Sequence, residues 1–568
     1  MRTISGFAKL TATNFITYEL MEVLIMGVFY SRARKWLGIQ FPHLEDLRHA
    51  LFLFKKIEFF TKPKAQKAIG LDRKLDLIEV NFQASSFLPF YYFILNSRIK
   101  GRNVVCYLPW PAKNFKEKAS WSAKGLFLGH YSSQVLIYRF MGVRTFIRPR
   151  NIDKSKTEII FCEIISSIHS LEDILKITIK GIWVGDLIYD QYLRTYRKGT
   201  IKLDDNEWLN FLYESCFTTL YWIDYFDQYD VNSVNVGHTC YFQAIPSRVA
   251  VSSNIKSFII MPDRAFYLSL NNFYDDAEYF RYPEIFSKEL DSKNREKALS
   301  LAKQKLEELF SGVQGVDSAH REVSGFKPQD DQVIFSLQKT NVLVSMHCFS
   351  DGPNSFGNNL FPDFVSWFNY LDKIAQKSKF VWYIKPHPAF NDDDKHIFNE
   401  LTEGKPWWNI LSARTSHTAI LANKVDLVLT MYGTVGFEYA YHGVKVVNAS
   451  RVNPHIGYKF NLHPASIEEY TRMILEPDAF EIDIDLKEIQ EYYFMRFIRN
   501  TKDIFYKNYD EMIESSGGYE KQWDSRDVFK YTRNKWDSVH DEKVREEFFE
   551  FLENPVGRYR YIPSYLAD

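Results

Sequence analysis

The spacing of apolar and polar residues divides the chain into stretches of different character. Residues 1–75 carry two apolar, aromatic runs with basic residues between them, a pattern typical of helices. From residue 76 to 330, short apolar or β-branched runs alternate with longer amphipathic stretches, which predict helices over 158–177, 207–228 and 291–310. This alternation predicts a parallel sheet covered by helices on both faces.

Short apolar runs in this first half predict its strands, at 104–108, 134–138, 145–147, 181–184, 234–236, 248–251 and 258–261. A stretch dense in Gly, Ser, Pro and Asp follows at 312–333 and has no periodicity, which is typical of a linker. We therefore expect a first Rossmann-like domain over 76–330.

The same alternation returns after the linker. Strands are predicted at 341–346, 380–384, 425–430 and 445–448, with helices over 361–376 and 435–441. Together they predict a second doubly wound α/β domain over 331–475. Residues 476–568 are charged and aromatic, and we expect them to form helices that pack back on the domains.

Composition narrows the classes of function. Lys plus Arg equals Asp plus Glu at 71 each, and this balance argues against a general nucleic-acid binder, which needs a basic excess. The five cysteines are scattered and form no CxxC pair, so neither a zinc ribbon nor a disulfide framework is indicated. A reducing cytoplasm is the expected compartment.

No run of about 18 apolar residues predicts a membrane span, and the N-terminal residues do not have the pattern of a signal peptide. The apolar segment 20–30 is followed by Arg32, Arg34 and Lys35. Two interpretations stay open for it. It is an interfacial helix that meets anionic lipid at the inner face of a bacterial inner membrane, or it is a buried helix with a basic end.

Two segments carry the strongest chemical signal, and each follows a predicted strand. Lys-Pro-His-Pro at 385–388 fixes His387 between two prolines beside Lys385, where the imidazole can donate to a phosphate or a leaving group. Met-Tyr-Gly-Thr-Val-Gly-Phe-Glu at 431–438 is a glycine-bearing turn that opens a helix. The carboxyl ends of parallel strands are where open α/β sheets bind ligands.

The turn at 431–438 has the chemistry of an anion site. Its glycines allow close backbone approach, and the N–H groups of a helix start favour phosphate. Thr434 can cap the helix or donate to phosphate, and Glu438 lies one turn later on the same face, where it can accept both ribose hydroxyls. The donor-nucleotide residues expected here are Gly433, Thr434, Val435, Gly436 and Glu438. An ordinary strand-turn-helix with Thr434 as N-cap is the alternative.

Taken together with Gly-Val-Lys-Val-Val at 443–447, the two segments resemble the capsule polysaccharide biosynthesis proteins. These are similar to bacterial Kdo transferases of the GT-B fold, which use CMP-activated sugars. The resemblance implies a GT-B-like pair of domains around a central cleft and donor contacts from His387, Thr434 and Glu438. The family's turn often has Ser-Ser or Ser-Thr where Tyr432-Gly433-Thr434 stands here, which leaves the nucleotide undetermined.

Candidate catalytic residues follow the strand at 341–346. His347 and Asp351 lie in His-Cys-Phe-Ser-Asp-Gly-Pro-Asn at 347–354, at the junction of the two predicted domains. An aspartate there can act as a general base toward an acceptor hydroxyl, or as the nucleophile of a retaining double displacement. Ser-Asp-Gly-Pro is also a good turn sequence, so an Asx-turn is the structural alternative.

The first half supplies the expected acceptor side. Asp186 and Asp190 follow one predicted strand and are the other candidate bases. Polar and aromatic residues at the strand ends are candidate acceptor contacts, with Arg248 able to pair with an anionic sugar or phosphate: Tyr189, His238, Tyr241 and Arg248. Helix capping by Asp186 and His238 is the alternative.

No P-loop, HExxH or convincing DxD motif occurs, so we expect neither a metal nor a cofactor. The expected function is therefore metal-independent glycosyl transfer from a nucleotide sugar, CMP-linked by resemblance, to a bacterial surface polysaccharide or lipid-linked glycan. Other polysaccharide-assembly enzymes are the expected partners. The alternatives are a UDP-sugar 2-epimerase, a polyol-phosphate transferase, or a non-catalytic scaffold of polysaccharide export.

Overall fold

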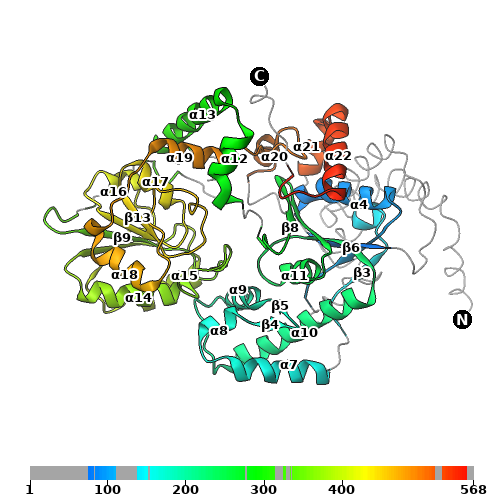
Figure 1. Ribbon diagram of the computed structural model, residues 1–568, viewed down its shortest axis with the longest axis horizontal. Helices are drawn as coiled ribbons and strands as arrows, with labels where there is room; N and C mark the ends of the chain where they lie inside the picture. The colour runs from blue at the N-terminus through cyan, green and yellow to red at the C-terminus, as the bar shows by residue number, and fades with distance from the viewer. Residues whose placement is uncertain are drawn as a thin grey trace, which may run out of the picture.

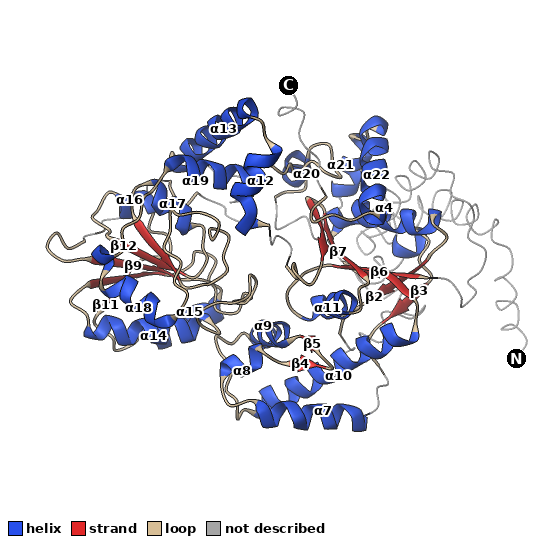
Figure 2. Cartoon of the chain, in the orientation of Figure 1, coloured by secondary structure: helices blue, strands red, loops and turns tan. Residues whose placement is uncertain are grey.

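The computed structural model describes residues 74–81, 83–110, 137–150, 154–274, 278–313, 324–327, 333, 335–518 and 527–559. Within these ranges the chain forms two α/β units, each built on its own sheet, which lie side by side in Figure 1. Helices cover both faces of each sheet (Figure 2). Two doubly wound units confirm the predicted GT-B-like α/β fold class.

The first sheet has six strands in the order β3-β2-β1-β6-β7-β8, and only the β7–β8 pair is antiparallel. The strands are β1 (Leu75–Glu79), β2 (Asn103–Tyr107), β3 (Thr145–Ile147), β6 (Val231–Val236), β7 (Lys256–Met261) and β8 (Arg264–Leu268). Alternate residues face opposite sides of a strand. Ile78 therefore packs against α4 (Phe87–Ile99), while Leu77 joins the core under α10 (Asn206–Gln228) and α11 (Ile245–Ser252).

The second sheet is entirely parallel, in the order β11-β10-β9-β12-β13. Its strands are β9 (Asn341–Ser345), β10 (Val381–Lys385), β11 (Trp408–Ile410), β12 (Leu427–Thr430) and β13 (Lys445–Asn448). One face packs on α14 (Phe364–Lys377) and α18 (Ile467–Leu475), and the other on α16 (His417–Leu421) and α17 (Val435–Tyr441). The strands consist of apolar residues in nearly continuous runs, as expected when both faces are buried.

Two groups of helices join parts of the chain that lie far apart in sequence. α12 (Tyr282–Glu289) and α13 (Ser292–Phe310), which precede the linker, share a core with α19 (Leu486–Tyr493) and with α17 of the second unit. Farther along, α20 (Tyr509–Ser515), α21 (Asp527–Asn534) and α22 (Ser538–Glu553) return to the first unit and pack beside α4 (Figure 1).

The strand predictions at 134–138 and 248–251 are wrong. Residues 134–136 lie outside the described residues, and 137–140 are helical. Residues 248–251 belong to α11, which begins at Ile245 with Pro246 in its first turn. A short, fully buried helix presents an apolar run that periodicity cannot separate from a buried strand. The expected helices of residues 1–73, with the candidate membrane segment 20–30, also lie outside the described residues.

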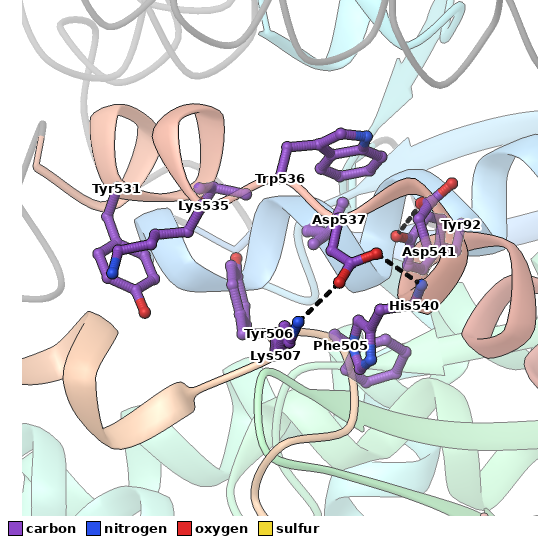
Figure 3. A pocket seen from close by; sticks show the side chains of 12 residues that line it. Tyr92, Phe505, Tyr506, Lys507, Tyr531, Lys535, Trp536, Asp537, His540 and Asp541 are labelled. Carbon is purple, nitrogen blue, oxygen red and sulfur yellow. Dashed lines mark hydrogen bonds and ion pairs between the residues drawn. The ribbon is translucent and has the colours of Figure 1, made fainter.

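No helix among the described residues is long and apolar enough to cross a membrane. A small pocket lies among the C-terminal helices (Figure 3), where α4 meets the segment 505–507 and the start of α22. Two pairs of its polar side chains are engaged with each other. Lys507 pairs with Asp537 at 2.7 Å, and the Tyr92 hydroxyl donates to Asp541 Oδ1 at 2.5 Å.

Candidate functional site

In each sheet the chain adds strands first on one side of its first strand and then on the other side, so the strand order reverses there. We call the end of that first strand the reversal point of the sheet. β1 lies between β2 and β6, and β9 lies between β10 and β12. In open α/β sheets, the crevice at such a reversal, at the carboxyl ends of the strands, is the usual ligand site. Glu79 ends β1 and Gly237 follows β6 in the first unit, while the segment after β9 begins with Met346 and His347 in the second.

Hydrogen bonds join the segment 347–363 of the second unit to the first unit. The Tyr241 hydroxyl donates to Asp351 Oδ1 at 3.2 Å. The Asn354 amide and backbone N–H donate to the Asp190 carboxylate at 2.8 and 3.2 Å. The structure thus brings the predicted acceptor-side residues of α9 (Gly185–Tyr196) and the 237–244 segment against the predicted catalytic segment.

Tyr189 contributes to the same junction from inside the core. Its buried hydroxyl donates to Asp363 Oδ2 at 2.5 Å. The other oxygen of Asp363 accepts from the backbone N–H of Ser366 at 2.6 Å and so caps α14. Tyr189 therefore links the two units through this hydrogen bond, and the burial of its side chain disfavours a direct contact with an acceptor.

The three candidate aspartates differ in exposure. Asp351 is exposed, whereas Asp190 and Asp186 are only 2% and 3% exposed. Burial raises the pKa of Asp190 well above its usual range, although the bonds from Asn354 act against this. Asp190 is buried and both of its oxygens already accept from Asn354, so the geometry favours the exposed Asp351 over Asp190 for contact with substrate.

Asp186 forms a buried ion pair with Arg248. Arg248 Nη2 lies 2.6 Å from Asp186 Oδ2, and the Tyr274 hydroxyl donates to the same oxygen at 3.0 Å. The guanidinium is also 4.3 Å from the ring centroids of both Trp183 and Phe273. Burial acts to lower the pKa of Arg248, but the charges and hydrogen bonds of Asp186 and Tyr274 together outweigh it, and the pKa is raised. This pair joins α9 to α11 inside the first unit, and its burial disfavours both the expected base and the expected anion contact.

His347 bridges the reversal point of the second sheet. Its Nε2 lies 3.1 Å from Thr430 Oγ1 at the end of β12, and its ring stacks on Phe364 at 4.8 Å. Burial, with a smaller effect from His387, lowers the pKa of His347 to about 3. The imidazole is therefore neutral at physiological pH and holds the two strand ends together.

His387 lies just after β10, next to the same segment. Its Nδ1 accepts the backbone N–H of Ala389 at 3.2 Å and lies 3.4 Å from Cys348 Sγ. A neutral ring that accepts at Nδ1 carries its proton on Nε2, which gives the donor that the sequence predicted. Lys385 is buried and its Nζ donates to the Ala413 carbonyl at 3.0 Å.

Neighbouring side chains pack closely on the backbone of the turn at 431–438. A Cβ on Gly433 would lie 2.9 Å from Thr430 Oγ1, and one on Gly436 would lie 2.6 Å from His455 Nδ1. Thr434 stands at the N-cap position of α17 without a side-chain capping bond, so the predicted cap is absent. Val435 packs into the core and Glu438 is 1% exposed, although the sequence predicted a ribose contact for Glu438.

The segment after β6 carries Tyr241 in an unusual backbone conformation. Tyr241 has φ of +63°, which is rare for a residue with a side chain, and the Arg194 guanidinium lies 4.5 Å above its ring. His238 Nδ1 accepts the Cys240 backbone N–H at 3.0 Å, so His238 shapes this turn. Its ring centroid is 5.4 Å from that of Tyr241.

Sequence reasoning missed the roles of four residues near this junction: Glu79, Asn354, Asp363 and Tyr432, whose hydroxyl donates to the Gly352 carbonyl at 3.3 Å. Glu79 ends an apolar run at 75–80 that was assigned to a domain boundary, and recognising this run as a strand could have found it. Asn354 and Asp363 lie in the 347–363 segment, but their partners in the first unit are distant in sequence. Asp190 is 164 residues from Asn354, and Tyr189 is 174 residues from Asp363. No local sequence signal shows such a pairing.

Within the described residues, no cluster of three or more His, Cys, Asp or Glu side chains is arranged to hold a metal ion. The exposed Asp351, with the Tyr241 hydroxyl 3.2 Å away, is placed for proton transfer or nucleophilic attack, whereas a pKa of about 3 makes His347 too weak a base for that role.

The chain matches no family model and no curated protein. Among solved structures it is similar to KpsC, a beta Kdo 2,7 transferase of Thermosulfurimonas dismutans, with 14% identity, 48% of this chain and 80% of that chain covered, and a TM-score of 0.30.

It is also similar to a UDP-GlcNAc 2-epimerase of Neisseria meningitidis bound to UDP-GlcNAc, with 10% identity and a TM-score of 0.22; the match covers 74% of this chain and 97% of that chain. A third similar structure is UGT89C1 of Arabidopsis thaliana complexed with UDP-L-rhamnose, with 12% identity and a TM-score of 0.18; the match covers 85% of this chain and 100% of that chain. At these values, the similarities assign neither an activity nor a site residue to this chain.

Proposed function

We propose that this chain is a glycosyltransferase that moves a sugar from a nucleotide-activated donor to a bacterial surface polysaccharide or lipid-linked glycan. The observation that carries the proposal is the Tyr241–Asp351 contact. It sets an exposed carboxylate of the second unit 3.2 Å from a hydroxyl of the first, beside the reversal points of both sheets. A group that transfers a sugar between two bound substrates needs this position between two ligand-binding sheet edges.

The donor is proposed to bind the second unit. His387 follows β10, and Thr434 and Glu438 follow β12, so they come after the two strands that flank β9, in the order in which the Kdo-transferase resemblance implies nucleotide contacts. A CMP-linked, Kdo-like sugar is the favoured donor. His387 would donate through Nε2 to a phosphate oxygen and stabilise the charge that develops on the leaving nucleotide.

Asp351 is the proposed catalytic residue. As a general base, its carboxylate takes the proton of the acceptor hydroxyl while that oxygen attacks the anomeric carbon and the nucleotide leaves. As a nucleophile, it attacks the anomeric carbon and displaces the nucleotide; the acceptor hydroxyl then attacks the same carbon, gives its proton to the released nucleotide phosphate or to water, and frees the Asp351 carboxylate with net retention. The bond from Tyr241 orients the carboxylate in either mechanism.

The first test is a thermal-shift panel of the purified full chain against CMP, CDP, UDP, GDP and ADP. A ligand that binds only the folded state adds about 2.7 kcal/mol at 100 times its dissociation constant. A shift with CMP alone supports the Kdo-like donor, and CMP-Kdo should then release CMP when a glycan acceptor is added.

The remaining outcomes separate the alternatives. A shift with UDP, together with conversion of UDP-GlcNAc in the absence of any acceptor, would replace the proposal with a 2-epimerase. A shift with CDP and turnover of CDP-glycerol would indicate a polyol-phosphate transferase. Absence of any shift and of any turnover would leave the scaffold function.

A further inference from the structure

Glu79 is a buried carboxylate at the reversal point of the first sheet, outside the set of residues discussed for catalysis. It is the last residue of β1, and its side chain is 2% exposed. Oε2 accepts the backbone N–H of Gly237 at 2.5 Å, and Oε1 accepts the side-chain amide of Gln243 at 2.9 Å. The two oxygens therefore hold both ends of the segment 237–243.

This segment is the one that presents Tyr241 to Asp351. The glycine at 237 permits this close approach, because a Cβ there would lie only 3.0 Å from Glu79 Oε2 and would push on the carboxylate. Tyr241 sits inside the segment with its strained φ of +63°, a conformation that persists only when surrounding contacts enforce it. Phe242 N–H donates to Gln191 Oε1 at 3.1 Å, which fixes the segment to α9 next to the Glu79 contact.

We propose that Glu79 is a positioning residue for the transfer reaction: by accepting from Gly237 and Gln243 it holds the 237–243 segment so that the Tyr241 hydroxyl orients Asp351. The inference rests on the proposed function, since it gives Asp351 the catalytic role. Glu79 touches neither substrate nor Asp351, and its effect passes through the backbone of one short segment.

The charge state of Glu79 fits this arrangement. Gly237 and Gln243 both donate to it, so only the ionised carboxylate can accept from both at full strength. Burial raises the pKa of Glu79 to about 7, although the two bonds act against the rise. The titratable groups that face it, Tyr107 on β2 and Tyr138, have pKa values raised by burial and are neutral at this pH. The segment should therefore loosen as pH falls below about 7.

The test compares Glu79→Gln with Glu491→Gln in the full chain. Glu491 is a matched control because its pKa is also raised to about 7, while it accepts from Tyr458 beside α19, away from the 237–243 segment. Amide hydrogen exchange over 237–243 should be at least about 10-fold faster in Glu79→Gln and unchanged in Glu491→Gln.

With CMP-Kdo as the probe, kcat of Glu79→Gln should fall about 10- to 100-fold, while KM for the donor stays within about 2-fold because the donor site lies on the other unit. The fall in wild-type kcat below pH 7 should disappear in this variant. Gln243→Leu, which removes one donor without altering the buried carboxylate, should change exchange and kcat in the same direction. This second variant decides the matter if Glu79→Gln fails to fold.

If Glu79→Gln leaves amide hydrogen exchange over 237–243 unchanged, the proposal is overturned. Faster exchange in this variant with an unaltered kcat also overturns it. Failure of the wild-type chain to turn over any nucleotide sugar has a different meaning. It removes the proposed function, and with it the catalytic consequence of Glu79, whereas the exchange experiment still decides whether Glu79 holds the segment.

Discussion

Asp351, Asp186 and Asp190 carry the same side chain in three different surroundings. Asp351 is exposed beside the Tyr241 hydroxyl, Asp186 is buried against Arg248, and Asp190 is buried against Asn354. The sequence placed each of them after a strand but could not rank them. Their ranking depends on pairings made through the folded structure, such as the one from Asp186 to Arg248, 62 residues away.

Asp351→Asn should lower kcat by about 100-fold or more, since it removes the oxygen that acts as base or nucleophile but keeps the shape and the bond from Tyr241. The thermal shift with the nucleotide should stay as in wild type, because the proposed donor contacts follow other strands. Steady-state kinetics and the shift measured on one preparation check both points. Wild-type turnover in Asp351→Asn would exclude Asp351 as base or nucleophile.

Asp186→Asn should lower the free energy of unfolding by about 3–5 kcal/mol, because it leaves the buried Arg248 charge without its partner. Urea denaturation followed by circular dichroism measures this. Asp392→Asn is the control, since it breaks an exposed pair with Lys395 and should leave the midpoint unchanged. A wild-type midpoint for Asp186→Asn would show that the ion pair does not stabilise the fold.

His347 predicts a pH dependence of stability. Its pKa falls from 6.5 to about 3 on folding, so below pH 6.5 the unfolded chain binds a proton that the folded chain does not. The free energy of unfolding is therefore unaffected by protonation of His347 above pH 6.5. As pH falls from 6.5 toward 3, this histidine lowers the free energy of unfolding by up to about 1.4 kcal/mol per pH unit.

His347→Gln should therefore gain stability relative to wild type as pH falls from 6.5 to 4.5. Urea midpoints at several pH values measure the difference, and it is the difference that matters because Glu79 and Glu491, with pKa values raised to about 7, act in the opposite direction. His396→Gln, at an exposed histidine, serves as control. Parallel pH curves for wild type and His347→Gln would contradict the prediction.

Elements were predicted best where local pattern and packing agree. α17 and β13 have the bounds that the sequence predicted, since a glycine turn and a buried apolar strand define them locally. Residues 248–251 of α11 were predicted as a strand because the run Val-Ala-Val is apolar in either structure. The turn at 431–434 was correctly placed between a strand and a helix, whereas its tight packing against the segment after β13 was not visible in the sequence.

Gly436→Ala tests that packing at the start of α17. The added Cβ would lie 2.6 Å from His455 Nδ1 and 2.7 Å from Asn461 Nδ2, so overpacking should cost about 1–3 kcal/mol of unfolding free energy. In a His455→Ala background the same change should cost less, because the imidazole that it meets is gone. Equal costs in the two backgrounds, measured by denaturation, would show that His455 is not the obstacle.

At the scale of the whole molecule, neither half is built from one continuous stretch of chain. α12 and α13 share a core with α17 and α19, and the last described helices complete the core beneath α4. The sequence predicted C-terminal helices but could not show which unit they cover, because a helix with apolar residues fits any complementary face. The two units are therefore joined by exchanged helices as well as by the bonds around Asp351.

Deletion of residues 500–568 should leave a chain that aggregates, since it removes Phe505, Phe548 and Phe551 from the core that buries α4. Deletion of 560–568 is the matched control, because it removes none of these three. The soluble fraction after expression and the elution volume in size exclusion measure the result. A soluble monomer with wild-type helix content after the longer deletion would show that the first unit is complete without them.

The return of α22 to α4 has a consequence for biosynthesis. Tyr92 and Asp541 are hydrogen-bonded partners separated by 449 residues. At about 5–20 residues per second, a ribosome needs roughly 20–90 s to make the second after the first. During that time, the apolar face of α4 is made but not covered by its final neighbours. Folding of the N-terminal half is thus completed only after α22 has been made, and molecular chaperones that shield nascent chains should associate with it until then.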